Sequence, residues 1–266
     1  MFLAAGMPTD LHSTVSPAVV LAIFAAAALA AAGYAIYLAV SRRDLVPVVV
    51  CVGALVCAFN EPIYDLLGKI LYADNHPMAY SYFGRDIPWF LVVGYLPWVG
   101  LLPYLIAQAM RDGVPRSKLH LLAFGSFVSV VLVETFGNSV HAWTYYGEAP
   151  LKFLVVAPQM APVPIVGGFL LFAVADRLAG WKRVVAAFAI STMALPMVFA
   201  SASWPLYVGL NADLPTVVNW ILGIAMLALS AGTVVAATQL GENHRRFLEL
   251  EGRHLGSAEP DRLPVR

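Results

Sequence analysis

The chain has 266 residues, of which 60% are hydrophobic and only 12% are charged, and its mean hydropathy is +0.76. A water-soluble domain carries roughly 25% charged residues, so the composition excludes an ordinary soluble globular protein. The 16 basic and 16 acidic residues balance to a net charge of zero, which gives no sign of a nucleic-acid partner.

Apolar segments of membrane-spanning length recur along the chain, since one helical span needs ~20 residues. The fifth segment has Pro158, Pro162 and Pro164 in its first half, so we expect a broken or re-entrant start there. We predict seven spans, over residues 17–40, 45–67, 87–110, 119–141, 153–175, 184–205 and 214–239.

The basic residues alternate between the two sides of this predicted bundle. Thirteen of the 16 follow the first, third, fifth and seventh spans, and only Lys69, Arg85 and Lys152 fall on the other side. Basic residues favour the cytoplasmic side of a membrane. We therefore predict an all-α, multi-pass protein of the cell membrane, with seven transmembrane helices, the N-terminus outside and the C-terminus in the cytoplasm. Residues 1–240 form the transmembrane domain, and residues 241–266 form a short charged cytoplasmic tail.

Several common chemistries are not indicated by the sequence. The last predicted span lacks the lysine that would bind retinal, and no His-x-x-x-His or Glu-x-x-His metal-ligand spacing occurs within the predicted spans. No nucleophile elbow, phosphate loop or dinucleotide fingerprint is present, so we expect no metal and no cofactor. Cys51 and Cys57 lie in one predicted helix on different faces, which indicates apolar packing residues and not a disulfide.

Two glutamates fall inside predicted membrane helices, where a carboxylate costs roughly 3 kcal/mol even on insertion-based scales. From the cytoplasmic ends of their helices, Glu61 lies ~24 Å and Glu134 ~22 Å into a core ~30 Å thick. The two side chains thus share one level near the outer face. Hydrogen bonding that specifies helix packing is the structural alternative to a chemical role.

Polar neighbours share helix faces with these glutamates. Asp65 follows Glu61 by four residues, and Asn138 and His141 follow Glu134 by four and seven. Pro62 lacks the N–H that would bind a carbonyl one turn earlier, so we predict an unpaired carbonyl and a bend in the helix at Glu61.

Further candidates lie at the same level or in the outer segments. The outer segments are rich in Tyr and Trp, which belt any membrane interface but also stabilise a cation with their ring faces. We expect these residues to position a lipophilic substrate: Asn138, Gln159, Asn219, Tyr64, Trp98 and Trp143.

Short motifs resemble those of the avermectin spirocyclase (AveC-like) family of membrane proteins, over roughly residues 45–210. The motifs are residues 60–65 (NEPIYD), residues 85–88 (RDIP), Glu134 followed by His141, Trp143 and Tyr145, and residues 158–164 (PQMAPVP). The resemblance implies formation of a spiroketal from a dihydroxy-ketone polyketide, with dehydration in some members.

We expect a cofactor-independent membrane cyclase or dehydratase, with isomerase or lyase chemistry on a lipophilic polyketide- or isoprenoid-like substrate. Glu61 and Glu134 would be acid and base, while Asp65 and His141 relay or orient protons. Membrane terpene cyclases are the nearest competing enzyme class. A non-catalytic lipid- or isoprenoid-binding protein, or a proton-linked transporter, is the alternative. A transporter requires an ionisable group in the inner half of the same cavity.

Overall fold

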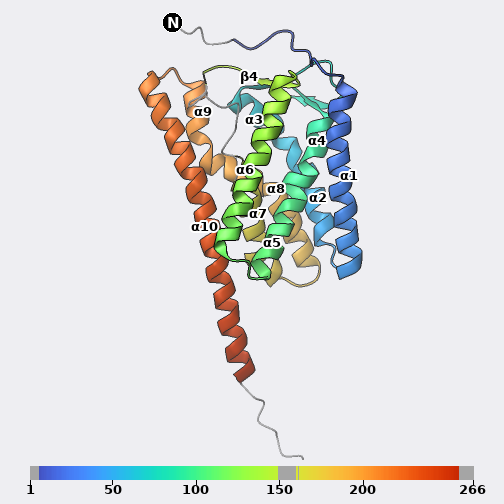
Figure 1. Ribbon diagram of the computed structural model, residues 1–266, viewed down its shortest axis with the longest axis vertical. Coiled ribbons are helices and arrows are strands. Elements are labelled where there is room, and N and C mark those ends of the chain that lie inside the picture. Colours follow the sequence, from blue (N-terminus) through green and yellow to red (C-terminus); the bar gives the residue numbers. More distant parts are fainter. Residues whose placement is uncertain (1–5, 149–159, 161, 258–266) are drawn as a thin grey trace, which may run out of the picture.

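The computed structural model describes residues 6–148, 160 and 162–257, which form a bundle of helices standing roughly side by side (Figure 1). Six helical stretches within these residues are long and apolar enough to cross a membrane. The chain is therefore a largely helical membrane protein. The helices are α1 (Pro17–Arg42), α2 (Val46–Cys57), η1 (Ala58–Asn60), α3 (Glu61–Gly68), α4 (Trp89–Tyr95), η2 (Leu96–Leu101), α5 (Leu102–Arg111), α6 (Arg116–Ser139), α7 (Pro162–Ala173), η4 (Ala175–Arg177), α8 (Trp181–Ala202), α9 (Trp204–Asn211) and α10 (Thr216–Ser257).

Six of the seven predicted spans match these stretches to within a few residues at most ends, apart from the last. The stretches are Pro17–Arg42, Val46–Gly68, Trp89–Arg111, Arg116–Ser139, Trp181–Ala202 and Thr216–Gly252. For the predicted span 153–175, the described helix is α7, whose 12 residues cover only ~18 Å. The rest of that span's first half, residues 153–159 and 161, lies outside the described residues.

Two spans are not uniform α-helices. The second changes from α2 through the single 3₁₀ turn η1 into α3, and the third changes from α4 through a π-helical turn, η2, into α5. The predicted unpaired carbonyl one turn before Pro62 is that of Ala58, and it accepts a hydrogen bond of 2.5 Å from the Tyr80 hydroxyl. Pro97 lies in the π-helical turn, and such turns often occur at functional sites.

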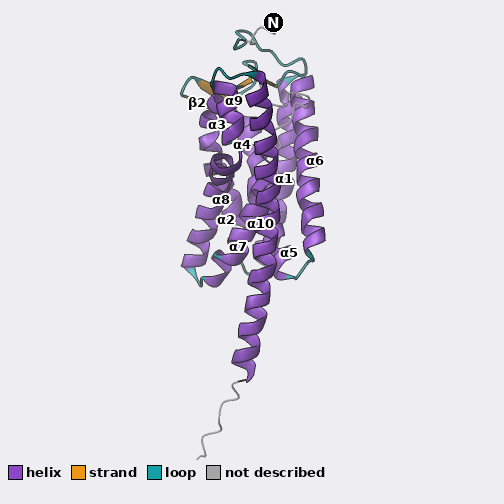
Figure 2. Ribbon diagram, turned by 90° about the vertical axis from the view of Figure 1, so that its left-hand side faces the viewer, coloured by secondary structure: helices purple, strands orange, loops and turns teal. Residues whose placement is uncertain are grey.

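Two short antiparallel strand pairs cover one end of the bundle, and α10 projects from the other (Figures 1 and 2). The strands are β1 (Ile70–Tyr72), β2 (Met78–Tyr82), β3 (Arg85–Pro88) and β4 (Trp143–Tyr145); β1 pairs with β4, and β2 with β3. We call this end the strand end. The opposite end is the basic end, because helices end or begin there at Arg42, Arg111, Arg116 and Trp181, which is followed by Lys182 and Arg183.

The interior is built by helices that approach closely. The short helix α7 packs against α5, α8 and α10, and α2 packs against α8. A Cβ atom at Gly168 of α7 would lie 2.5 Å from Cγ2 of Ile106 of α5. The free, buried Cys51 and Cys57 belong to this packed interior. By contrast, α6 contacts α7, α10 and β4, and its remaining inner face borders a cavity.

Candidate functional site

A cavity of about 640 Å³ lies between α1, α6 and the α4–η2–α5 segment. It begins beneath β1 and β4, and its lining extends to Leu105 of α5 and Ser129 of α6. Among the described residues that line it, two carry carboxyl groups, Glu61 and Glu134, and none is Lys, Arg or His. The cavity is therefore an apolar space that contains acids from two different helices.

Glu61 is the first residue of α3, and its buried side chain is held by two phenols. The Tyr72 hydroxyl of β1 donates to Oε1 at 2.8 Å, and the Tyr95 hydroxyl of α4 donates to Oε2. Burial, followed by the charges of Asp65 and Glu61, raises the pKa of Tyr72 well above its ordinary value. Tyr72 is therefore a neutral phenol at physiological pH and serves as a donor.

Glu134 occupies the inner face of α6 and is held by an indole. The Nε1–H of Trp143 donates to Oε2 of Glu134 at 2.8 Å, and the Tyr145 hydroxyl also faces this carboxyl. The Trp143 ring reaches α6 only because residue 137 is glycine: a Cβ atom at Gly137 would lie 2.0 Å from the Trp143 ring. Gly137 therefore sets the position of the Trp143 donor.

The strand pairing brings the two donor systems together. In the β1–β4 register, Tyr72 lies opposite Trp143, so one cross-strand pair supplies a donor to each glutamate. The Phe90 ring stacks on Trp143 with centroids 5.7 Å apart, and Phe24 lies 5.2 Å from Phe90. These rings fix the strand-end wall of the cavity.

Asp65 lies behind Glu61 and not in the cavity lining. Its side chain is completely buried, and neither carboxylate oxygen has a hydrogen-bond partner among the described residues. Tyr72 and Arg85 lie within electrostatic reach of it. Arg85 is itself buried, donates to the Tyr146 hydroxyl and lies 5.6 Å from the centre of that ring. Asp65 is thus a buried acid close to the Tyr72 donor of Glu61.

The sequence-predicted residues divide into two groups. Those that line the cavity are Glu61, Glu134, Tyr64, Trp98 and Trp143. Four others do not: Asp65, as described above, Asn138, His141 and Asn219. Gln159 lies outside the described residues.

The reasons for the second group are local. The Asn138 amide donates to the backbone carbonyl of Glu134 at 2.9 Å, so it serves its own helix. The expectation that His141 shares a face with Glu134 is wrong, because α6 ends at Ser139 and His141 is exposed with a φ of 55°. Asn219 lies in the first turn of α10 and is not among the residues that line the cavity with the two glutamates.

Sequence reasoning assigned no site role to Tyr72, Tyr95, Tyr145 or Gly137. Tyr95 could have been found by the depth argument, because it lies ~12 Å below the predicted outer end of its helix at residue 87. Tyr72 and Gly137 carry no such signal, since their roles depend on the pairing of β1 with β4.

No family model, curated protein or solved structure matches this chain. Among the described residues, no group of three or more His, Cys, Asp or Glu side chains is placed to hold a metal ion.

Proposed function

We propose that this chain is an integral-membrane enzyme of the cyclase or dehydratase type, which cyclises a lipophilic polyketide- or isoprenoid-like substrate by acid–base chemistry. The observation that carries the proposal is that Glu61 and Glu134, from two helices, line one apolar cavity with no basic residue among its described lining. Two carboxylates in such a space could not both be charged at low cost. One proton is therefore assigned to the pair.

The pair would act as one acid and one base, without an assigned order. The protonated carboxyl gives its proton to a carbonyl, hydroxyl or alkene of the substrate, and the other carboxyl takes a proton from the attacking hydroxyl or from carbon. Transfer of the proton from the second carboxyl back to the first restores the starting state of the pair. In a dehydration, the protonated hydroxyl of the substrate leaves as water. Tyr72, Tyr95 and Trp143 hold the carboxyls in place. No cofactor enters this scheme.

The shape of the cavity supports a lipophilic substrate. Lining residues of α1 and α6 are also widely exposed on the apolar surface: Ile23 is 50% exposed, Leu132 is 65% exposed and Val133 is 43% exposed. The open side of the cavity thus lies between these two helices, at the level of the hydrocarbon. A substrate would enter sideways from the bilayer.

The number of spans and their orientation in the membrane are also proposed. We assign seven spans, counting the segment that ends with α7, with the strand end outside and the basic end in the cytoplasm of a cell membrane. The gathering of basic residues at the end from which α10 projects supports this orientation (Figure 1). On its motifs alone, the chain is also proposed as a relative of the avermectin spirocyclases.

The lining of the cavity also bears on two alternative functions, a proton-linked transporter and a non-catalytic binding protein. A proton-linked transporter needs an ionisable group in the inner half, but the described lining there is formed by Leu101, Leu102, Leu105 and Ser129. This favours a dead-end pocket over a transport path. A non-catalytic lipid- or isoprenoid-binding protein would use the same pocket without turnover.

The test offers the purified protein in detergent a panel of lipophilic hydroxyketones and polyprenyl compounds. Glu61→Gln and Glu134→Gln should each lower turnover by about 100-fold or more, because a general acid or base contributes roughly 10²–10⁴. Glu148→Gln, an exposed glutamate at the strand end, is the matched control and should keep full activity. Turnover unaffected by both cavity substitutions would overturn the site. Binding without turnover of any compound would favour the binding protein.

A further inference from the structure

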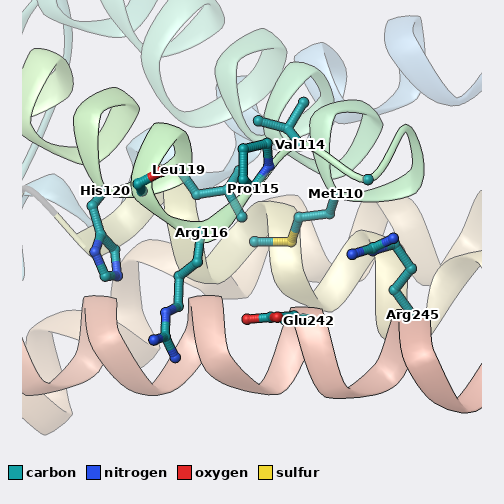
Figure 3. Close-up of a pocket in the computed structure, with 11 residues that line it drawn as sticks. Met110, Val114, Pro115, Arg116, Leu119, His120, Glu242 and Arg245 are labelled. Atoms are coloured by element: carbon teal, nitrogen blue, oxygen red, sulfur yellow. The ribbon is translucent and has the colours of Figure 1, made fainter.

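A second cavity, of about 460 Å³, lies at the basic end, between the turn that joins α5 to α6 and the part of α10 near Gly241 (Figure 3). The turn is tight at Gly113, which has a φ of 71°. Figure 3 shows Arg116 and His120 pointing from α6 toward α10, and Arg245 pointing from α10 toward the turn. Two guanidinium groups, one from each helix, therefore form part of the cavity wall.

The charges in this cavity are not all compensated. Arg245 pairs with Glu249 at 2.9 Å, and Glu242 pairs with Arg246 at 2.5 Å. Arg116, in contrast, makes no hydrogen bond or ion pair with its side chain to any residue that the structure describes. The Arg116 guanidinium is thus available to bind an anion, and the Arg245 guanidinium beside it has Glu249 as an ion-pair partner.

The turn is shaped to hold the Arg245 guanidinium. A Cβ atom at residue 113 would lie 3.0 Å from Nη1 of Arg245, so the absence of a side chain at Gly113 lets this group rest on the turn. His120 is held by Thr238 of α10, with 2.9 Å between Nε2 and Oγ1. Both helices therefore contribute fixed parts of the wall.

The cavity lies at the boundary between polar and apolar surface. Arg116 begins α6, and only five residues later Leu121 is 67% exposed, followed by Phe124 at 61%. A membrane helix exposes such side chains to lipid tails. A ligand with an anionic head and apolar chains would therefore satisfy both surfaces, whereas a soluble anion would satisfy only the first.

We propose that this cavity binds the phosphate headgroup of an anionic membrane phospholipid, with Arg116 and Arg245 as its ligands and the acyl chains against Leu121 and Phe124. Basic pockets between membrane helices on the cytoplasmic side suit such headgroups. The lipid would join α6 to α10. Because α6 also carries Glu134, the bound lipid would steady one wall of the larger cavity. The binding site itself does not depend on the proposed enzyme activity.

The test counts lipids retained by the full chain in native mass spectrometry, after incubation with phosphatidylglycerol or phosphatidylcholine of identical acyl chains. We expect preferential retention of phosphatidylglycerol. Arg116→Gln and Arg245→Gln should each weaken it about fivefold, since a basic residue near the surface contributes on the order of 1 kcal/mol. Arg42→Gln, an exposed arginine at the basic end outside this lining, should leave retention unchanged.

Three outcomes would overturn the lipid assignment. They are equal retention of both lipids, full retention of phosphatidylglycerol by the two lining variants, and displacement of phosphatidylglycerol by an equal concentration of glycerol 3-phosphate. The last result would assign the cavity to a soluble phosphate ester.

Discussion

Charged groups are compensated differently at the two ends of the bundle. At the basic end, Arg183 binds both oxygens of Asp44 at 2.8 and 3.0 Å and one oxygen of Asp176 at 3.2 Å, and Arg111 also pairs with Asp176. At the strand end, Glu61 and Glu134 are buried with neutral phenol and indole donors. One cluster cancels its charges, and the other does not.

The basic-end cluster has a structural role, whereas the strand-end acids are suited to proton transfer. Opposite charges at the basic end join the segment before α2 to the end of α5, to η4 and to the start of α8, which explains them as packing elements. Glu61 and Glu134, which have no basic residue beside them in the described cavity lining, contribute little to packing. They can instead hold a proton next to an apolar cavity. Substitutions at the two ends should therefore affect different properties.

The largest effect is expected from Gly137→Ala. The added Cβ would lie 2.0 Å from the Trp143 ring, so the indole must move and its bond to Glu134 is lost. We expect turnover to fall about 100-fold, and stability to fall by about 1–3 kcal/mol from overpacking. Activity assays and thermal unfolding in detergent measure both. Gly125→Ala on the same helix, where nothing lies within 4 Å, is the control. Equal behaviour of the two variants would refute the role of Gly137.

Arg183→Gln should show the opposite pattern. It leaves Asp44 and Asp176 without their shared partner, and because the arginine side chain is 27% exposed we expect a loss of about 2 kcal/mol in unfolding free energy. Turnover per folded molecule should not change. The adjacent, exposed Lys182→Gln should be neutral in both assays. A fall in turnover without a fall in stability would remove the distinction between the two ends.

Tyr72→Phe should have a smaller effect, confined to the strand end. It removes one of two donors to Glu61, so we expect kcat to fall about tenfold with little change in unfolding temperature. Tyr34→Phe, on the exposed face of α1, provides the matched change. Unchanged kcat in Tyr72→Phe would mean that Tyr95 alone holds the carboxyl.

The smallest effect concerns His76, which packs edge-on against Phe90 with centroids 4.8 Å apart. Burial lowers the pKa of this imidazole below its ordinary 6.5. The unfolded chain thus binds more protons below that pH, so the His76 contribution is present above pH 6.5 and is lost as the pH falls. We expect unfolding temperature to drop by about 1–2 °C more in wild type than in His76→Phe between pH 7.5 and 5. Equal drops in unfolding temperature for wild type and His76→Phe would contradict the lowered pKa of His76.

The spans were predictable because they depend on composition and length alone. Apolar segments, alternating basic residues and Pro62 all act locally, so the six long helices and the freed carbonyl before Pro62 follow from them. The strand pairs, the π-helical turn and α9 were not predicted, since they depend on contacts between distant segments and lack a periodic signal. The helix α10 also runs unbroken past residue 240 to Ser257.

The site was predictable only where helix depth decides the position. Depth placed Glu61 and Glu134 at one level, and both line the cavity. Spacing along one helix failed at His141, because a left-handed residue after the end of α6 turns the chain. The cross-strand pair of Tyr72 and Trp143 depends on the β1–β4 register, which no single segment encodes.

The central claim is that Glu61 and Glu134 share one proton in an uncompensated apolar cavity. Infrared difference spectroscopy at neutral pH, comparing wild type with Glu61→Gln, Glu134→Gln and Asp65→Asn, tests it without a substrate. We predict a carbonyl band of a protonated carboxylic acid that is lost or shifted by each glutamate substitution, because each changes the partner of the other. A spectrum without that band, or a band removed by Asp65→Asn alone, would contradict the claim.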